Sequence, residues 1–191
     1  MNIIQIGCNN GNDHVYKFIN DNTHSVKKAL LADVSEKAIG MAMELYKDHP
    51  NVEIINIAIC PENQNEIEIF HVGDLADQGL SYRINHFSDH GNNTKTNSFI
   101  AKCKTINKFI EDSDMDIIDR LYIDIEGLDC VVVNEIDLAK HDIRMIQFEH
   151  VHSEYTGDQG NSELYKKVVG KLIANGFSIS TLETDTVAVR L

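Results

Sequence analysis

Short apolar runs alternate with amphipathic segments along most of the chain. Seven runs of four to seven residues are rich in Ile, Val and other apolar residues, which is typical of buried strands. Because helix-period segments separate most of them, we expect an α/β fold with a mostly parallel sheet covered by helices on both faces. The predicted strands are Ile3–Gly7, Ala29–Asp33, Val52–Ala58, Leu121–Asp124, Met145–His150, Phe177–Leu182 and Val187–Leu191.

Three segments carry apolar residues at the spacing of a helix. They are His14–Asn20, Ser35–Asp48 and a segment that begins at Ser162 and stops at Gly176. Ser35 is a candidate N-cap, because its hydroxyl can accept a hydrogen bond from the first turn. The last two predicted strands are joined only by the short turn Glu183–Asp185, so we expect a C-terminal antiparallel hairpin.

Residues 73–98 interrupt this alternation and are rich in Gly, Asn, Ser, Asp and His. A long irregular segment inside a compact domain is usually functional or disordered. We interpret it as a substrate-facing loop, with a passive insertion as the alternative. The length of 191 residues is typical of one domain, so we expect a single domain over residues 1–191.

Composition and charge exclude several classes of function. The net charge of −13, without any cluster of Lys or Arg, opposes nucleic-acid binding. No apolar run approaches the roughly 20 residues that cross a bilayer, and the first residues lack the features of a secretory signal. The cysteines form no CxxC pair, which indicates neither a zinc site nor a disulfide framework and fits a reducing cytoplasm. They are Cys8, Cys60, Cys103 and Cys130.

The first predicted strand runs into a turn marked by two glycines, IQIGCNNG at Ile4–Gly11. Gly7 allows the backbone to turn close to a ligand, and Gly11 allows the next helix to start near the strand. A dinucleotide fingerprint requires a further glycine two residues after the first, where this sequence has Asn9. The spacing therefore favours a cofactor without phosphates.

Asp33 ends the second predicted strand, 22 residues after Gly11. A carboxylate at this place can accept both ribose hydroxyls of an adenosine. The alternative is that Asp33 only precedes the helix cap at Ser35. Together, the glycine turn and Asp33 favour nucleoside binding.

With these residues placed, the segment LYIDIEGLDCVVV at Leu121–Val133 resembles the signature of the FkbM-type methyltransferase family, whose fourth strand reads close to KIDVEG. The segments IINIAIC at Ile54–Cys60, KCKTINKFI before the fourth strand, and IQFEHVH at Ile146–His152 echo the same pattern. The resemblance implies a class I methyltransferase fold, which is a Rossmann-like three-layer sandwich with a seven-stranded, mostly parallel sheet. It also implies methyl transfer from S-adenosylmethionine to a hydroxyl of a sugar or small metabolite.

The resemblance also assigns cofactor-binding positions. The glycine turn would line the methionine end, Asp33 would hold the ribose, Ala58 and Ile59 would lie beside the adenine, and Asp124 would face the sulfonium. Two positions depart from the family pattern, because Gln5 replaces an acidic residue and Tyr122 replaces a lysine. The complete set is Gln5, Gly7, Cys8, Asn9, Gly11, Asp33, Val34, Ala58, Ile59 and Asp124.

Methyl transfer to a hydroxyl requires alignment of the oxygen and removal of its proton. The candidate catalytic residues are Asp124, Glu126 and His150. On an extended strand, Asp124 and Glu126 would point to one face, where paired carboxylates raise the pKa of one of them. The alternatives are that Glu126 caps the following helix and that His150 is a hydrogen-bonded structural residue.

The sequence is also consistent with two other hypotheses. Five residues could assemble a divalent metal site of the kind that polarises a substrate hydroxyl, although we expect no metal. A non-catalytic protein that keeps the fold as a cofactor-binding or partner module is the second alternative, which Gln5 and Tyr122 favour. The metal-site residues would be Asp124, Glu126, Glu149, His150 and His152.

Overall fold

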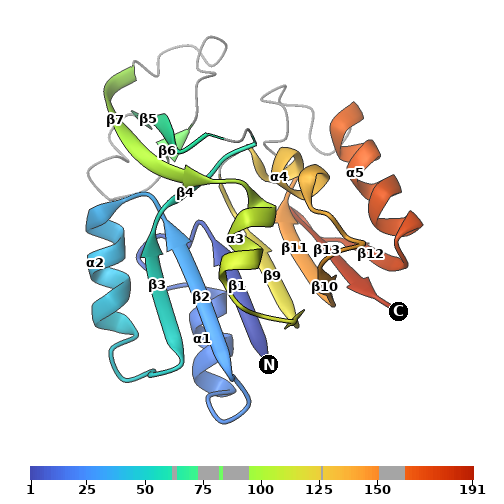
Figure 1. Ribbon diagram of the computed structural model, residues 1–191, viewed down its shortest axis with the longest axis horizontal. Coiled ribbons are helices and arrows are strands. Elements are labelled where there is room, and N and C mark those ends of the chain that lie inside the picture. The colour runs from blue at the N-terminus through green and yellow to red at the C-terminus, as the bar shows by residue number, and fades with distance from the viewer. Residues whose placement is uncertain (62–63, 73–81, 84–94, 126, 151–161) are drawn as a thin grey trace.

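A seven-stranded sheet forms the centre of the protein (Figure 1). The computed structural model describes residues 1–61, 64–72, 82–83, 95–125, 127–150 and 162–191. Adjacent strands of the sheet pair in parallel except at β13, which is antiparallel to both of its neighbours. The predicted mostly parallel sheet with a C-terminal antiparallel hairpin is thus confirmed. In spatial order the strands are β12 (Phe177–Thr181), β13 (Asp185–Arg190), β11 (Met145–Glu149), β9 (Arg120–Ile123), β1 (Asn2–Ile6), β2 (Lys28–Asp33) and β3 (Val52–Asn56).

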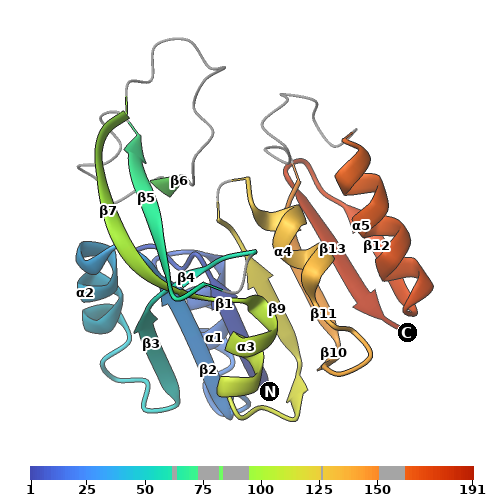
Figure 2. The same ribbon diagram turned by 45° about the horizontal axis from the view of Figure 1, so that its top comes forward.

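Helices cover both faces of this sheet and complete three layers (Figure 2). Helices α1 (His14–Asp21) and α2 (Glu36–Leu45) bury Val15, Ile19 and Ile39 in one apolar cluster with residues of one sheet face. Helices α3 (Ile106–Asp112), α4 (Asp129–Glu135) and α5 (Glu163–Ala174) contribute to the cluster on the other face. The three-layer α/β architecture expected from the sequence is confirmed.

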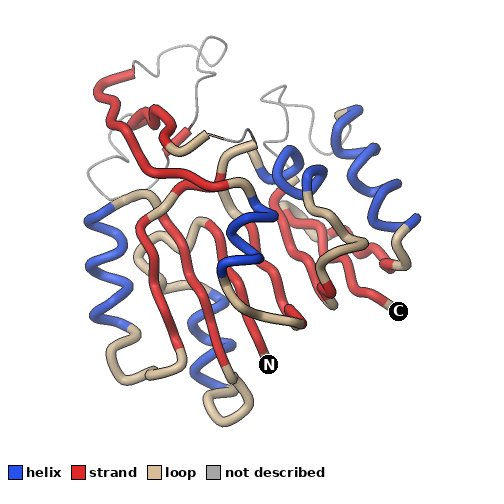
Figure 3. Tube along the Cα trace, viewed as in Figure 1, coloured by secondary structure: helices blue, strands red, loops and turns tan. Residues whose placement is uncertain are grey.

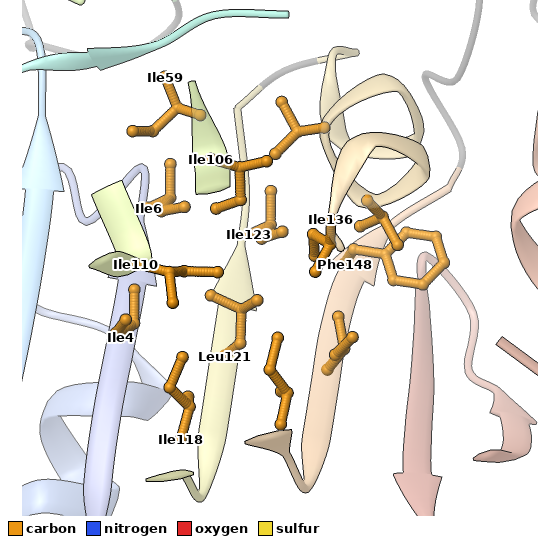
Figure 4. Packing of buried hydrophobic residues seen from close by; sticks show 14 of the residues in the cluster. Ile4, Ile6, Ile59, Ile106, Ile110, Ile118, Leu121, Ile123, Ile136 and Phe148 are labelled. Carbon is orange, nitrogen blue, oxygen red and sulfur yellow. The ribbon is translucent and has the colours of Figure 1, made fainter. Parts of the chain in front are cut away.

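Side chains alternate between these two clusters along β1 because successive residues of a strand point to opposite faces. Ile3 packs with α1, whereas Ile4 and Ile6 pack with Leu121 and Ile123 of β9 under α3 and α4 (Figure 4). All five are at most 2% exposed. The central strands are therefore buried on both sides, and their carboxyl ends are held in fixed positions.

The helix starts follow the hydrogen-bonding residues of the sequence. Ser35 and Ser162 act as N-caps of α2 and α5, accepting from Ala38 N at 3.2 Å and Tyr165 N at 3.0 Å. Asp13 caps α1 in the same way, through Val15 N and Tyr16 N. The caps therefore fix where α1 and α2 begin after β1 and β2.

A second, four-stranded sheet, not expected from the sequence, lies beyond the carboxyl ends of β2 and β3 (Figure 3). The predicted strand Val52–Ala58 was wrong at its end, because Ala58 belongs to this second sheet. The main-sheet strand stops at Asn56, because Ile57 N donates to Asp33 O at 2.9 Å and Ala58 pairs with Cys103 instead. The strands in spatial order are β4 (Ala58–Ile59), β7 (Lys95–Lys104), β5 (Glu66–Val72) and β6 (Tyr82–Arg83).

The predicted irregular segment 73–98 was wrong in part. Residues 82–83 form β6, and residues 95–98 begin β7, which pairs antiparallel with β5. The remainder of the segment, 73–81 and 84–94, lies outside the described residues. A two-stranded parallel sheet of β8 (Ile117–Ile118) and β10 (Asp142–Ile143) also escaped prediction. No helix in the described ranges is both long and apolar enough to cross a membrane.

Candidate functional site

The glycine turn after β1 is fixed by backbone hydrogen bonds to β2. Gly7 N and Cys8 N both donate to Ala32 O, at 2.9 and 3.0 Å, and Gly11 N donates to Cys8 O at 2.8 Å. Gly7 and Gly11 have φ of +79° and +76°, and Asn9 has φ of +48°. These left-handed conformations favour glycine and tolerate asparagine, so the residue types match the turn.

Gly7 lies directly against the backbone of the β9–α4 loop. A Cβ atom on Gly7 would lie 1.7 Å from the carbonyl oxygen of Asp124, which no adjustment of a side chain could relieve. Asp124 N in turn donates to Ile6 O at 2.9 Å, so the two segments are locked together. Gly11 lies close to α2, although we expected it to let α1 start near β1. A Cβ atom on Gly11 would lie 3.3 Å from Ala42 in α2 and 2.9 Å from Tyr46, which follows α2.

Asp33 holds this turn and the start of α2 with one carboxylate. Its Oδ2 accepts from Asn9 N at 2.8 Å, and its Oδ1 accepts from Ser35 N at 2.9 Å. Burial raises the pKa of Asp33, and the backbone N–H donors oppose that rise. The two carboxylate oxygens have about four acceptor positions in all, and the backbone N–H groups of Asn9, Ser35 and Val34 do not fill them, so acceptor capacity remains for a ligand hydroxyl. The helix-leading role considered from the sequence is thus real and compatible with ribose binding.

Two other residues of the predicted cofactor set have buried side chains. Gln5 is 3% exposed, and its Nε2 donates to Asp13 Oδ2 at 2.5 Å, which steadies the cap of α1. Cys8 is 1% exposed and packs in the cluster of α1 and α2. Burial raises the pKa of the Cys8 thiol, and nearby Asp33 and Asp13 raise it further, so the thiol stays protonated. Cys8 therefore presents its backbone, not a thiolate, at the turn.

A cavity of about 710 Å³ opens beside Val34, next to Asp33. Strand β7 supplies one wall of it with Phe99, Ile100 and Ala101, none of which the sequence analysis placed at the site. A signal for the supporting sheet was present, because EIEIFHV in β5 alternates polar and apolar residues. The lining residues are Val34, Ser35, Glu36, Lys37, Asn56, Phe99, Ile100, Ala101 and Lys102.

The residues predicted to lie beside the adenine are buried at the junction of the two sheets. Ala58 and Ile59 are each 3% exposed. Ile59 packs in the main core with Ile6 and Ile123, whereas Ala58 belongs to a small cluster that Val34 and Phe99 cover. The structure thus brings Ala58 and Val34 together at the junction of the two sheets.

Asp124 does not lie on the strand, so the prediction that it shares one strand face with Glu126 was wrong for Asp124. Strand β9 ends at Ile123, and Asp124 follows as an exposed residue. Glu126 lies outside the described residues. Asp124 therefore stands at the carboxyl edge of the sheet, beside the Gly7 turn.

His150 follows β11, which pairs with β9 as expected. Its side chain is 5% exposed and is held by the C-terminal elements. Its Nδ1 lies 3.2 Å from Thr186 Oγ1, and its ring stacks on Tyr165 with centroids 5.1 Å apart. Tyr165 OH also contacts Thr186 Oγ1 at 2.9 Å. The contacts described for His150 are therefore with α5 and β13, and they support the structural alternative as well as a catalytic one.

Acid should destabilise the fold through His150. Burial lowers its pKa, while Asp185 and Glu149 oppose this shift. As pH falls below about 6.5, the unfolded state therefore binds a proton before the folded state does, and stability is lost. We expect His150→Gln to unfold with a smaller loss of free energy between pH 7 and 5 than the natural chain, measured by urea titration. The exposed His24→Gln control should show the natural pH dependence; an identical dependence in His150→Gln would contradict this account.

Of the five residues of the alternative metal site, Glu126 and His152 lie outside the described residues. Among the residues that are described, no group of three or more His, Cys, Asp or Glu side chains could hold a metal ion. The candidate site therefore consists of the glycine turn, Asp33 and Asp124, which follow the neighbouring strands β1, β2 and β9. Ligands bind at this carboxyl edge in open α/β sheets.

Solved structures of methyltransferases share the fold. Methyltransferase FkbM from Methylobacillus flagellatus KT is 9% identical, with a TM-score of 0.56 over 98% of this chain and 43% of that chain. An O-methyltransferase from Bacillus cereus, solved with S-adenosylhomocysteine, is 15% identical, with a TM-score of 0.52 over 99% and 74% of the two chains. An rRNA methylase from Streptococcus thermophilus is 13% identical, with a TM-score of 0.54 over 100% and 87%. The fold is that of a class I methyltransferase.

The family follows from the sequence match. Residues 1–179 match the Methyltransferase FkbM domain. No curated protein sequence matches the chain significantly. The chain belongs to the FkbM methyltransferase domain family, as its resemblance predicted, and is an S-adenosylmethionine-dependent methyltransferase.

Proposed function

We propose that this protein transfers a methyl group from S-adenosylmethionine to a hydroxyl oxygen of a sugar or small metabolite. The observation that carries the proposal is the contact between the Gly7 turn and Asp124, with Asp33 bonded to the same turn. This contact joins the expected cofactor site to an exposed carboxylate at the sheet edge. A hydroxyl brought to that edge would find a proton acceptor beside the cofactor.

The donor and acceptor groups of the site suit this cofactor. Asp33 keeps acceptor capacity for a ribose hydroxyl beside its bonds to the backbone N–H groups of Asn9, Ser35 and Val34. The backbone of the glycine turn would line the methionine end, and Val34 with Ala58 and Ile59 would form the adenine side. When bound, S-adenosylmethionine supplies a methyl group on a positively charged sulfur. The buried amide oxygen of Gln5 has no hydrogen-bond partner among the described residues, so it could accept a hydrogen bond from a ligand.

Asp124 is the residue we assign to proton removal. With S-adenosylmethionine bound, the Asp124 carboxylate would accept the proton of the substrate hydroxyl as the oxygen takes the methyl group and S-adenosylhomocysteine is left. General-base help of this kind contributes about 10²- to 10⁴-fold in rate. Glu126, two residues further on, and His150 are the other candidates. His150 would need to reach the substrate from its place between Thr186 and Tyr165.

The net charge of the protein limits which classes of compound can act as the methyl acceptor. A net charge of −13 repels polyanions such as nucleic acids, and a neutral hydroxyl compound meets no such barrier. Free sugars, glycans and small hydroxylated metabolites are therefore the substrate classes to test. Placement of the protein in a reducing cytoplasm is part of the same proposal, because the four cysteines are buried and form no disulfide.

The experiment is a methyl-transfer assay against a panel of sugars and small hydroxyl compounds. Formation of S-adenosylhomocysteine is measured with and without each acceptor. We expect acceptor-dependent turnover that falls at least about 100-fold in Asp124→Asn, with affinity for S-adenosylhomocysteine within about threefold of the natural chain. Asp119→Asn, a substitution at the opposite end of β9, is the control. Cofactor binding without turnover on any acceptor would instead favour the non-catalytic module.

A further inference from the structure

A buried carboxyl group binds the segment that follows Asp124, and the proposed mechanism does not use it. Asp129 is the first residue of α4 and is 1% exposed. Carboxylates are rarely buried to this degree unless they are paired or hydrogen-bonded. The hydrogen bonds of Asp129 therefore indicate its role.

Both oxygens of Asp129 accept hydrogen bonds from the loop that precedes the helix. Oδ1 accepts from Ile125 N at 3.2 Å, and Oδ2 accepts from Gly127 N at 3.1 Å. An ordinary capping side chain accepts instead from N–H groups of the first helical turn. The N-cap residue Leu128 makes no side-chain cap hydrogen bond. The carboxylate therefore fixes the loop more than it caps the helix.

The charge at this position is costly. Burial raises the pKa of Asp129 well above its usual range, Asp124 and Glu149 raise it further, and the two N–H donors oppose the rise. A neutral Asn or Ser would satisfy a helix start with less desolvation. Carboxyl groups in such surroundings are concentrated at functional sites.

The loop held by Asp129 carries the residues that meet the cofactor turn. It begins at Asp124, whose carbonyl oxygen is the atom that a Cβ on Gly7 would strike. Ile125 and Gly127, the two residues bonded to Asp129, flank the position of the candidate base Glu126. The position of this segment thus depends on one buried carboxylate.

We propose that Asp129 is a positioning residue: its carboxylate holds the backbone of Ile125 and Gly127 and so keeps Asp124 against the Gly7 turn. This inference rests on the proposed cofactor site, because the loop matters to function only if a cofactor lies at that turn. Asp129 itself is buried and is not assigned any contact with substrate.

The test compares Asp129→Asn and Asp129→Ser with the natural chain. In Asp129→Asn the amide nitrogen would face one of the two N–H donors, and in Asp129→Ser one acceptor is lost. We expect the amide hydrogens of Ile125 and Gly127 to exchange about 10- to 100-fold faster, beyond any change at the core strand β1. Calorimetry should show the affinity for S-adenosylhomocysteine falling about tenfold. Glu163→Gln, at the equivalent exposed first position of α5, should change neither.

Exchange at Ile125 and Gly127 that rises no more than exchange at β1 would overturn the proposal, because it would show only global destabilisation. Unchanged affinity in a variant with a loosened loop would overturn it too. If neither variant folds, the natural chain decides: added S-adenosylhomocysteine must slow exchange at these two amides, and no change despite binding refutes the coupling. Failure of the natural chain to bind S-adenosylhomocysteine would count against the proposed function instead.

Discussion

Replacing Gly7 by alanine is expected to abolish binding of S-adenosylhomocysteine and to destabilise the fold by more than about 3 kcal/mol. The new Cβ would lie 1.7 Å from the Asp124 carbonyl oxygen, and Gly7 has φ of +79°. The backbone can relieve this clash only by separating Gly7 from Asp124. That movement would break the bonds of Gly7 N to Ala32 O or of Asp124 N to Ile6 O.

The matched control is Gly170→Ala, on the exposed side of α5. A Cβ there meets nothing within 4 Å, so alanine should stabilise the helix by about 0.5–1 kcal/mol. Urea unfolding gives both free energies, and calorimetry gives the affinity for S-adenosylhomocysteine. A Gly7→Ala protein with natural stability and affinity would show that the turn is neither tightly packed nor used for the cofactor.

The second large effect is expected at Asp33. Asp33→Asn should weaken the affinity for S-adenosylhomocysteine by about 10- to 100-fold, because hydrogen bonds to a charged acceptor contribute about 1.5–3 kcal/mol. The remaining amide oxygen can still accept from Asn9 N or Ser35 N, so the fold should survive. Asp48→Asn, on the exposed segment after α2, should bind normally.

A ligand analogue separates ribose binding from a general effect on the turn. The 2′,3′-dideoxy analogue of S-adenosylhomocysteine lacks the hydroxyls that Asp33 is proposed to hold. It should bind the natural chain more weakly than S-adenosylhomocysteine, but Asp33→Asn should distinguish the two ligands much less. If Asp33→Asn lowered the affinity for both ligands equally, Asp33 would support the turn without contacting the ribose.

The sequence was most informative where local patterns determine structure. The apolar run before Gly7 predicted β1, and the glycine spacing predicted a tight turn that the φ values of Gly7 and Gly11 confirm. Asp33 was placed at the end of β2 because the strand pattern stops there. The N-cap at Ser35 and the helix start at Ser162 were equally local signals.

The sequence was least informative where pairing is long-range. Strand β7 has the sequence KTNSFIAKCK, which lacks a continuous apolar run. It is held by pairing with β4 and β5 and by the small cluster around Ala58, which a local pattern does not show. The contacts of His150 were missed because they depend on how α5 and β13 pack against the end of β11. The role of Asp129 could not be predicted either, because its carboxylate accepts from the backbone of Ile125 and Gly127, and the sequence does not show this arrangement.

The most direct test of the central claim is a crystal structure of the protein with S-adenosylhomocysteine. We predict that the ribose hydroxyls lie within hydrogen-bond distance of the Asp33 carboxylate and that the homocysteine portion lies along the turn Gly7–Gly11, with its sulfur facing Asp124. A ligand bound elsewhere, or one whose ribose does not contact Asp33, would contradict the account.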